Sequence, residues 1–214
     1  MARLDLPRFY PILDAALLLR AGLSIEGFAR ELRAAGIRFL QYREKEAADE
    51  LLLQRAALLR GIFIDSCLIL NDRVPLVLSA GYDGVHVGQE DLSPATARAT
   101  LGSELIVGVS THGESQLLLA ADSPVDYVAI GPVFATSSKQ VPDPVVGLEG
   151  VRAARALTDK PLVAIGGITR ANCAAVMEAG ADSVAVISDL IQNPGKSVED
   201  YFSRLGDHRE VSFG

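Results

Sequence analysis

The chain has 214 residues, 49% hydrophobic and 22% charged, a composition typical of a folded globular protein. Its formal net charge of −7 argues against a broad basic surface, so we expect no nucleic-acid partner. There is no signal-peptide pattern and no apolar run of about 18 or more residues, so we expect no membrane partner. Cys67 and Cys173 make neither a disulfide framework nor a CxxC zinc motif, which fits a cytoplasmic protein.

Eight short apolar runs recur along the chain, each followed by polar or glycine residues and then by an amphipathic or Ala- and Leu-rich stretch. Most runs are continuously apolar, which is typical of parallel strands covered on both faces. The predicted strands cover 10–13, 38–42, 68–70, 84–87, 105–109, 127–130, 162–165 and 183–187.

The stretches between these runs are predicted to be helices. Ser24 can cap the first of them and Gly36 can end it. Pro94 suits the first turn of a helix that starts at Ser93, and Thr169 can cap a later one. The helix from Thr169 is predicted to run to residue 179, and the other predicted helices cover 48–64, 74–80, 113–121, 148–157 and 197–205.

Strand and helix in alternation indicate an α/β protein with a parallel sheet. We predict a single (β/α)8 TIM barrel over residues 1–214, with a frayed tail after about residue 206. A doubly wound open sheet is the alternative, but no GxGxxG motif follows the first predicted strand.

Polar residues gather directly after seven of the predicted strands. In a barrel these positions share the C-terminal mouth, where the active sites of TIM barrels lie. Loops are polar in most proteins, but this explains poorly why Arg, Lys, Asn and Asp directly adjoin buried strands. The clusters are 41–45, 71–73, 88–91, 110–112, 136–139, 166–167 and 188–189.

A phosphate site is predicted after the last two strands. Gly166 and Gly167 let backbone N–H groups approach an anion, and Thr169 is expected to open the next helix. Ser188 would face the same place, because barrels often bind phosphate there. The alternative is a tight turn that needs glycine for steric reasons only.

A metal site is predicted from Asp72 and Asp91, which follow neighbouring strands. Two carboxylates in a chain with few histidines suit a hard cation such as Mg²⁺. Zinc is disfavoured because the Cys and His residues are scattered. Each aspartate alone could instead cap the helix that follows it.

Three cations, Arg43, Lys45 and Lys139, come from facing strands and would bind a second anion such as a diphosphate. Lys45 could instead pair with Glu44 or Glu46 at the surface. Among the histidines, His86 lies within a strand and reads as a packed core residue. His112 is either a general base or a hydrogen-bonded loop residue, and His208 falls in the tail.

Seven segments in order resemble the motifs of the thiamine phosphate synthase family. They are QYREK at 41–45, ILNDR at 69–73, GVHVGQEDL at 84–92, GVSTH at 108–112, DYVAIGPVFATSSK at 126–139, VAIGGI at 163–168 and DSVAVIS at 182–188. The resemblance implies a TIM barrel that joins 4-amino-5-hydroxymethyl-2-methylpyrimidine diphosphate to a thiazole phosphate, with thiamine phosphate and diphosphate as products. It implies that the diphosphate leaves before the thiazole nitrogen attacks, so no protein nucleophile is needed.

The resemblance also assigns residues by motif position. Those that resemble ligands of the pyrimidine diphosphate are Gln41, Arg43, Lys45, Asn71 and Lys139, and Glu44 of the same motif joins the substrate-binding set. Asp72 and Asp91 resemble the Mg²⁺ ligands, and Ser110 resembles the residue beside the pyrimidine. Those that resemble the thiazole phosphate site are Thr136, Ser137, Ser138, Gly167, Ile187 and Ser188. Catalytic roles would fall to Arg43, Lys45, Ser110 and Lys139.

The chain departs from the family pattern at Ser138, which stands where threonine is common, in the middle of the segment QVPDPVVGLEG, and at two further positions. Ala135 stands where proline is common in the loop after the sixth strand, and Tyr42 stands where leucine is usual. The rival readings are a thiazole tautomerase of the same superfamily, with proton transfer through His112, and a non-catalytic barrel that binds thiamine phosphates. The expected partners are the two small-molecule substrates, and a homo-oligomer is compatible with this reading.

Overall fold

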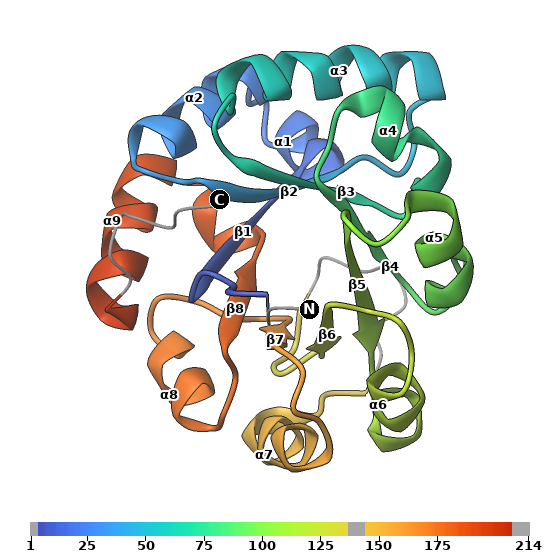
Figure 1. Cartoon of the computed structure of the whole chain (residues 1–214). Helices are drawn as coiled ribbons and strands as arrows, with labels where there is room; N and C mark the ends of the chain where they lie inside the picture. The colour runs from blue at the N-terminus through green and yellow to red at the C-terminus, as the bar shows by residue number, and fades with distance from the viewer. Residues whose placement is uncertain (1–3, 137–143, 207–214) are drawn as a thin grey trace.

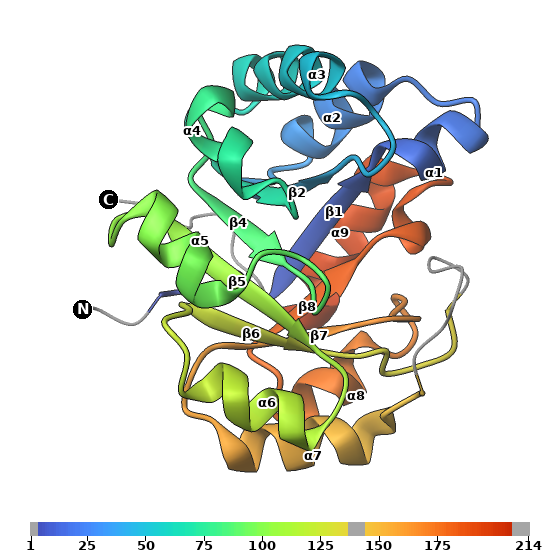
Figure 2. The ribbon, with the colours of Figure 1, turned by 90° about the vertical axis from the view of Figure 1, so that its right-hand side faces the viewer.

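The computed structural model describes residues 4–136 and 144–206. Its strands are parallel and close into a barrel in the order β1 to β8, surrounded by helices (Figure 1). Seen from the side, α3 and α4 cover one flank of the barrel and α6 and α7 the opposite flank (Figure 2). The strands are β1 (Phe9–Asp14), β2 (Phe39–Arg43), β3 (Cys67–Asn71), β4 (Gly84–Val87), β5 (Ile106–Thr111), β6 (Tyr127–Ile130), β7 (Leu162–Ile165) and β8 (Ser183–Val186).

The helices follow the strands in alternation. They are α1 (Ala15–Arg20), α2 (Ile25–Ala34), α3 (Asp49–Ile62), α4 (Val77–Ala80), α5 (Pro94–Leu101), α6 (Glu114–Ala121), α7 (Gly147–Leu157), α8 (Cys173–Glu178) and α9 (Pro194–Leu205), with short 3-10 turns η1 (Val74–Leu76) and η2 (Ser188–Leu190). None of them, within the described ranges, combines the length and the hydropathy that a bilayer-spanning segment needs.

The predicted barrel and all eight strands are confirmed, three of them with identical bounds. Three helix predictions need correction. Helix α1 was not expected, because Asp14 both ends β1 and caps α1, so no glycine or proline separates the two elements. Helix α8 begins at Cys173 and not at Thr169, because the side chain of Asn172 accepts the Thr169 N–H and holds a turn before the helix. Helix α9 begins at Pro194, three residues before the predicted start.

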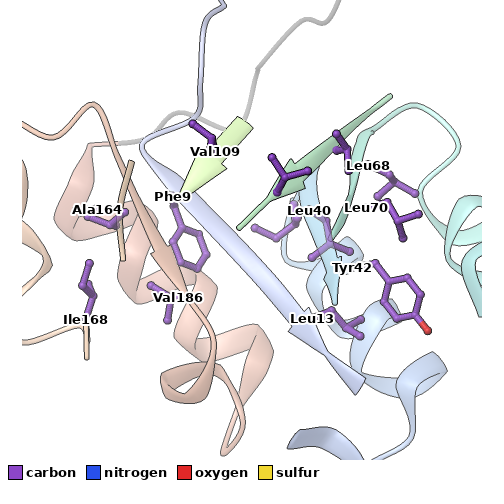
Figure 3. Close-up of a cluster of buried hydrophobic side chains, with 14 of the residues drawn as sticks. Phe9, Leu13, Leu40, Tyr42, Leu68, Leu70, Val109, Ala164, Ile168 and Val186 are labelled. Carbon is purple, nitrogen blue, oxygen red and sulfur yellow. The ribbon is translucent and has the colours of Figure 1, made fainter. Parts of the chain in front are cut away.

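Side chains of each strand alternate between two cores. Outward-facing residues such as Leu40, Tyr42, Leu68 and Leu70 pack beneath the helices, and Figure 3 shows them together with Phe9 and Val186. Inward-facing residues fill the barrel itself. They are Tyr10, Ile12, Phe39, Cys67, Ile69, Tyr127, Ala129, Val163 and Ala185. Because both faces of every strand are buried, the strands read as continuous apolar runs in the sequence.

Inside the barrel, one large ring occupies the place of a missing side chain. Gly108 of β5 pairs with Tyr127 of β6, and a Cβ on Gly108 would lie 2.0 Å from Cζ of Tyr127. Carbon atoms in contact are about 3.5–4.0 Å apart, so no other residue type fits at position 108 without a shift. The Tyr127 ring therefore lies directly against the backbone of β5.

Three Arg–Asp clasps brace the end of the barrel where the strands begin. In each clasp, an aspartate just before an even-numbered strand accepts a backbone N–H from the preceding strand and pairs with an arginine of a helix. The pairs are Arg60–Asp83, Arg98–Asp126 and Arg155–Asp182, at 2.5, 2.6 and 2.7 Å. The N–H groups belong to Leu68, Val107 and Leu162. Each clasp thus ties two neighbouring strands to the helix that precedes them.

Candidate active site

The strand pleat determines which of the predicted site residues face the interior of the barrel. Leu40 and Tyr42 of β2 point outward, so Gln41 and Arg43 between and beyond them point inward. By the same alternation Asn71 of β3 and Ser110 of β5 face the interior at the strand ends. The structure therefore brings side chains from three strands to one opening, as the sequence predicts.

The two predicted metal ligands lie together at this opening. Asp72 and Asp91 lie close enough for the Asp72 carboxyl to act on the pKa of Asp91, and Lys45 Nζ lies 2.9 Å from Asp72 Oδ2. Burial, and then the neighbouring Asp72, raise the pKa of the Asp91 carboxyl, while the Gly88 N–H bonded to it at 2.7 Å acts in the opposite direction. Two carboxylates held this close form a site that attracts a cation.

The competing interpretation of these aspartates as helix caps is not supported. Turn η1 is preceded by Arg73 with no side-chain cap, and α5 is capped by Ser93. Asp72 has a φ of 63°, the one positive value for a non-glycine residue in the described part of the chain. Backbone strain of this kind is typical of functional sites. The structure pairs Lys45 with Asp72, whereas the sequence also allowed a surface pair with Glu44 or Glu46.

Arg43 is held in place by a residue that the sequence reasoning missed. Asp14, at the end of β1, forms an ion pair with the Arg43 guanidinium and also caps α1 by accepting the Leu17 N–H at 2.8 Å. Asp14 is 5% exposed. The signal was present, because Asp14 directly adjoins the first apolar run in the same way as the polar residues after the other strands.

Glu44 is not brought to the opening. Its side chain is buried beneath α3, where it pairs with Arg55. The cause is again the alternation of the strand, which turns residue 44 outward when 43 faces inward. Arg73, in the predicted cluster after β3, pairs with Asp49 at 2.6 Å and so braces the start of α3.

The loops after β7 and β8 are tied to each other. The carboxylate of Asp189 accepts Arg170 Nε at 3.0 Å and the Tyr201 hydroxyl at 2.9 Å. Gly166 and Gly167 have φ values of 100° and 63°, and a Cβ at Gly167 would lie 2.6 Å from the carbonyl oxygen of Ala135. Glycine at position 167 is therefore required for steric reasons, and this requirement is compatible with a contact between its backbone and a phosphate.

Thr169 does not open a helix, so the dipole argument for that residue was wrong. Its N–H is bonded to the Asn172 side chain at 2.8 Å. Ile187 and Ser188 directly follow β8, and Ser188 begins η2. A phosphate bound at these loops would therefore contact Gly167 and Ser188.

The histidines differ in their surroundings. His86 is buried, as predicted, with Nδ1 2.9 Å from the Tyr127 hydroxyl and Nε2 2.8 Å from Ser110 Oγ. Burial lowers its pKa to about 4, so the ring is neutral at neutral pH. His112 donates from Nδ1 to the carbonyl oxygen of Gly131 at 2.6 Å, which fits a bonded loop residue. His208 lies outside the described residues.

Part of the predicted site also lies outside the described residues, namely Ser137, Ser138 and Lys139, with most of the loop that they occupy. Thr136 is described and lies at the edge of that loop. Asn71 is 7% exposed, and its Nδ2 has no hydrogen-bond partner among the described residues. A buried donor without a partner costs free energy, which a ligand oxygen would recover.

A family model described as thiamine monophosphate synthase matches residues 9–190 of the chain. The chain belongs to this family. A thiamine-phosphate synthase of Koribacter versatilis (strain Ellin345) is 51% identical over 94% of the chain and 97% of the relative. A thiamine-phosphate synthase of Chloroflexus aurantiacus is 41% identical over 86% of the chain and 85% of the relative.

Solved structures agree with this family assignment. The thiamine phosphate pyrophosphorylase of Pyrococcus furiosus superposes with a TM-score of 0.83 at 30% identity, covering 93% of this chain and 95% of that one. The resemblance inferred from the seven motifs is therefore confirmed. The family match includes β1 to β8 and so every described residue of the candidate site.

Proposed function

We propose that the chain is a thiamine-phosphate synthase. It condenses 4-amino-5-hydroxymethyl-2-methylpyrimidine diphosphate with 4-methyl-5-(2-phosphooxyethyl)thiazole, or its carboxylated form, and releases diphosphate. The observation that carries the proposal is the cluster of Lys45, Asp72 and Asp91 at the mouth of a barrel of this family. A site built only for a thiazole phosphate would have no use for a paired-carboxylate cation site beside a lysine.

The residues present fit a bound Mg²⁺. Magnesium prefers oxygen ligands and is commonly held by one or two carboxylates together with substrate phosphates. Asp72 and Asp91 supply such a pair, and no cluster of three or more His, Cys, Asp or Glu occurs among residues 4–136 and 144–206. Bound there, the cation would neutralise negative charge on the departing diphosphate.

The reaction needs no proton transfer by the protein. The methylene C–O bond breaks with its electron pair going to the diphosphate, and the lone pair of the thiazole nitrogen forms the new C–N bond. Arg43 and Lys45 would stabilise the charge that grows on the diphosphate, with Asp14 and Asp72 holding them in position. Asn71 Nδ2 would donate to an oxygen of the same group. Lys139 is assigned the same role by motif position.

The second substrate would bind at the loops after β7 and β8. Gly167 and Ser188 would contact its phosphate. The hydrogen bonds that Asp189 accepts from Arg170 and Tyr201 hold the two loops together. We assign Ser137 and Ser138 to the same phosphate by motif position, with Thr136 beside them. The proposal includes a cytoplasmic location, which the free thiols of Cys67 and Cys173 support.

The test is an assay of the purified protein with both substrates, in Mg²⁺ and then in excess EDTA. We expect thiamine phosphate only with Mg²⁺, and a loss of at least about a hundredfold in turnover for Asp72→Asn and for Asp91→Asn. The matched control is Asp65→Asn, a carboxylate exposed in the loop before β3, which should keep full activity. Product formed equally well in EDTA would refute the metal site, and no product from a folded wild-type protein would refute the synthase.

A further inference from the structure

A chain of hydrogen bonds crosses the interior of the barrel and ends at two of the substrate-facing residues. Gln41 Nε2 donates to the Tyr10 hydroxyl at 2.8 Å, and the hydroxyls of Tyr10 and Tyr127 lie 3.0 Å apart. Tyr127 in turn lies 2.9 Å from His86 Nδ1, and His86 Nε2 lies 2.8 Å from Ser110 Oγ. We call these five residues the interior relay. They come from β2, β1, β6, β4 and β5.

The relay is buried in an otherwise apolar interior, so its polar groups have little freedom. Tyr10 is 1% and Tyr127 0% exposed, and both lie among the aliphatic side chains that fill the barrel. The ring of Tyr127 stacks on His86 at 5.5 Å and meets Tyr10 edge-on at 6.1 Å. Because an unsatisfied polar group in such a place is costly, every donor of the relay should meet an acceptor.

This requirement determines the direction of each bond. A hydroxyl has one proton, and Tyr10 already accepts from Gln41, so its own proton goes to Tyr127. The proton of Tyr127 then goes to His86 Nδ1. A neutral imidazole that accepts at Nδ1 carries its proton on Nε2, and it donates that proton to Ser110 Oγ.

The two ends of the relay therefore have opposite hydrogen-bonding character toward the mouth. The Ser110 hydroxyl accepts from His86, so its own proton remains available as a donor. The Gln41 amide is oriented by Tyr10, and none of the described residues donates to its Oε1, which remains available as an acceptor. A single reversal anywhere in the relay would reverse both ends together.

We propose that the interior relay fixes the polarity of the pyrimidine site, with Gln41 as acceptor and Ser110 as donor, and so selects a 4-aminopyrimidine over a 4-oxopyrimidine. An aminopyrimidine offers an amino N–H to Gln41 and a ring nitrogen lone pair to Ser110. A 4-oxo ring would place a carbonyl oxygen against Gln41 Oε1. Tyr10, Tyr127 and His86 touch no substrate in this scheme and are positioning residues. The ligand identity rests on the proposed function, whereas the tautomer of His86 does not.

The first experiment reads the tautomer directly. In protein labelled with ¹⁵N-histidine, the His86 signals are assigned by their loss in His86→Gln. We expect the chemical shift of an unprotonated nitrogen at Nδ1 and of a protonated one at Nε2. In Tyr127→Phe, which removes the donor to Nδ1, the two shifts should move toward each other. A proton on Nδ1 in the wild-type protein would overturn the proposal whatever the enzyme catalyses.

The second experiment measures selectivity by calorimetric binding of the hydroxymethylpyrimidine phosphate and of its 4-oxo analogue. We expect the wild-type protein to prefer the amino form by at least about a hundredfold, because a site built to hydrogen-bond a substrate N–H rejects an analogue that lacks it more strongly than a hydrophobic pocket does. In Tyr127→Phe the Tyr10 proton is free to go to Gln41 Oε1, so the amide can reverse and the ratio should fall to about tenfold or less.

Two further variants complete the design. Tyr10→Phe breaks the relay at another bond and should lower the ratio even if Tyr127→Phe fails to fold. Tyr82→Phe is the matched control, because its hydroxyl is also buried and bonds a backbone carbonyl outside the barrel interior at 3.5 Å. An equal ratio in the wild-type, Tyr10→Phe and control proteins would overturn the proposal. Failure of the wild-type protein to bind either pyrimidine would instead count against the proposed function, while the tautomer result would stand.

Discussion

The contact between Gly108 and Tyr127 permits a sharp test of the barrel interior. In Gly108→Ala the new Cβ would lie 2.0, 2.4 and 2.5 Å from three atoms of the Tyr127 ring. Normal contact requires the ring to move by about 1.5 Å. Overpacking of this kind costs about 1–3 kcal/mol, and the movement also breaks the bonds of the Tyr127 hydroxyl to Tyr10 and His86, at about 1 kcal/mol each. We expect a total loss of about 3–5 kcal/mol in the free energy of unfolding.

The matched control makes the same chemical change where there is room. Gly61, near the end of α3, has no atom within 4 Å of the Cβ it would gain, and Gly61→Ala should stabilise the protein by about 0.5–1 kcal/mol through helix propensity. Urea unfolding followed by circular dichroism measures both variants. In thermal unfolding the Tm of Gly108→Ala should fall by about 6–20 °C. A Gly108→Ala protein within about 0.5 kcal/mol of the wild type would show that the Tyr127 ring does not lie where the structure has it.

Three other predictions follow from single contacts. Glu44→Gln should lower the free energy of unfolding by about 2 kcal/mol, because Arg55 loses its charged partner, and it should leave the KM for the pyrimidine diphosphate unchanged. A tenfold rise in that KM would show that Glu44 contacts the substrate. Asp189→Asn should raise the KM for the thiazole phosphate about tenfold, because Arg170 loses its partner. An equal rise in the KM for the thiazole phosphate and the KM for the pyrimidine diphosphate would contradict this prediction. The folded-state pKa of His86 is about 4 against an ordinary 6.5, so the unfolded chain binds more protons between these values. Stability measured in EDTA should therefore fall by about 3 kcal/mol as the pH drops from 6.5 to 4, and His86→Gln should flatten that slope.

Strands were readable from the sequence because burial on both faces leaves a continuous apolar run, and Gly88, Gly131 and Gly166 directly follow three of them. Helix α1 was not readable, since Asp14 serves β1 and α1 at once and leaves no break in the pattern. The start of α8 was misplaced because Thr169 is a good cap by type, whereas the side chain of Asn172 decides where the turn ends. Local rules thus failed where one side chain acts on two elements.

The candidate site, like the fold, could be predicted from the sequence only in part. Strand alternation alone places Gln41, Arg43 and Ser110 on the inner face, and it also explains why Glu44 is turned away. What the sequence does not contain is the stagger between strands around the closed barrel. Only that stagger determines that Tyr127 meets His86 rather than another inward side chain. Partners across a barrel depend on tertiary geometry, so the interior relay required the structure.

The Arg–Asp clasps have a consequence for how such a barrel could acquire new chemistry. Each clasp joins residues of one helix–strand–helix–strand unit, and all three lie at the end opposite the mouth. The loops after β4 and β6, which carry Asp91 and Thr136, run between these units. Exchanging either loop for one of another length would leave every clasp intact. The barrel can therefore accept grafted loops, because the ion pairs that stabilise it lie at one end and the residues of the candidate site lie at the other.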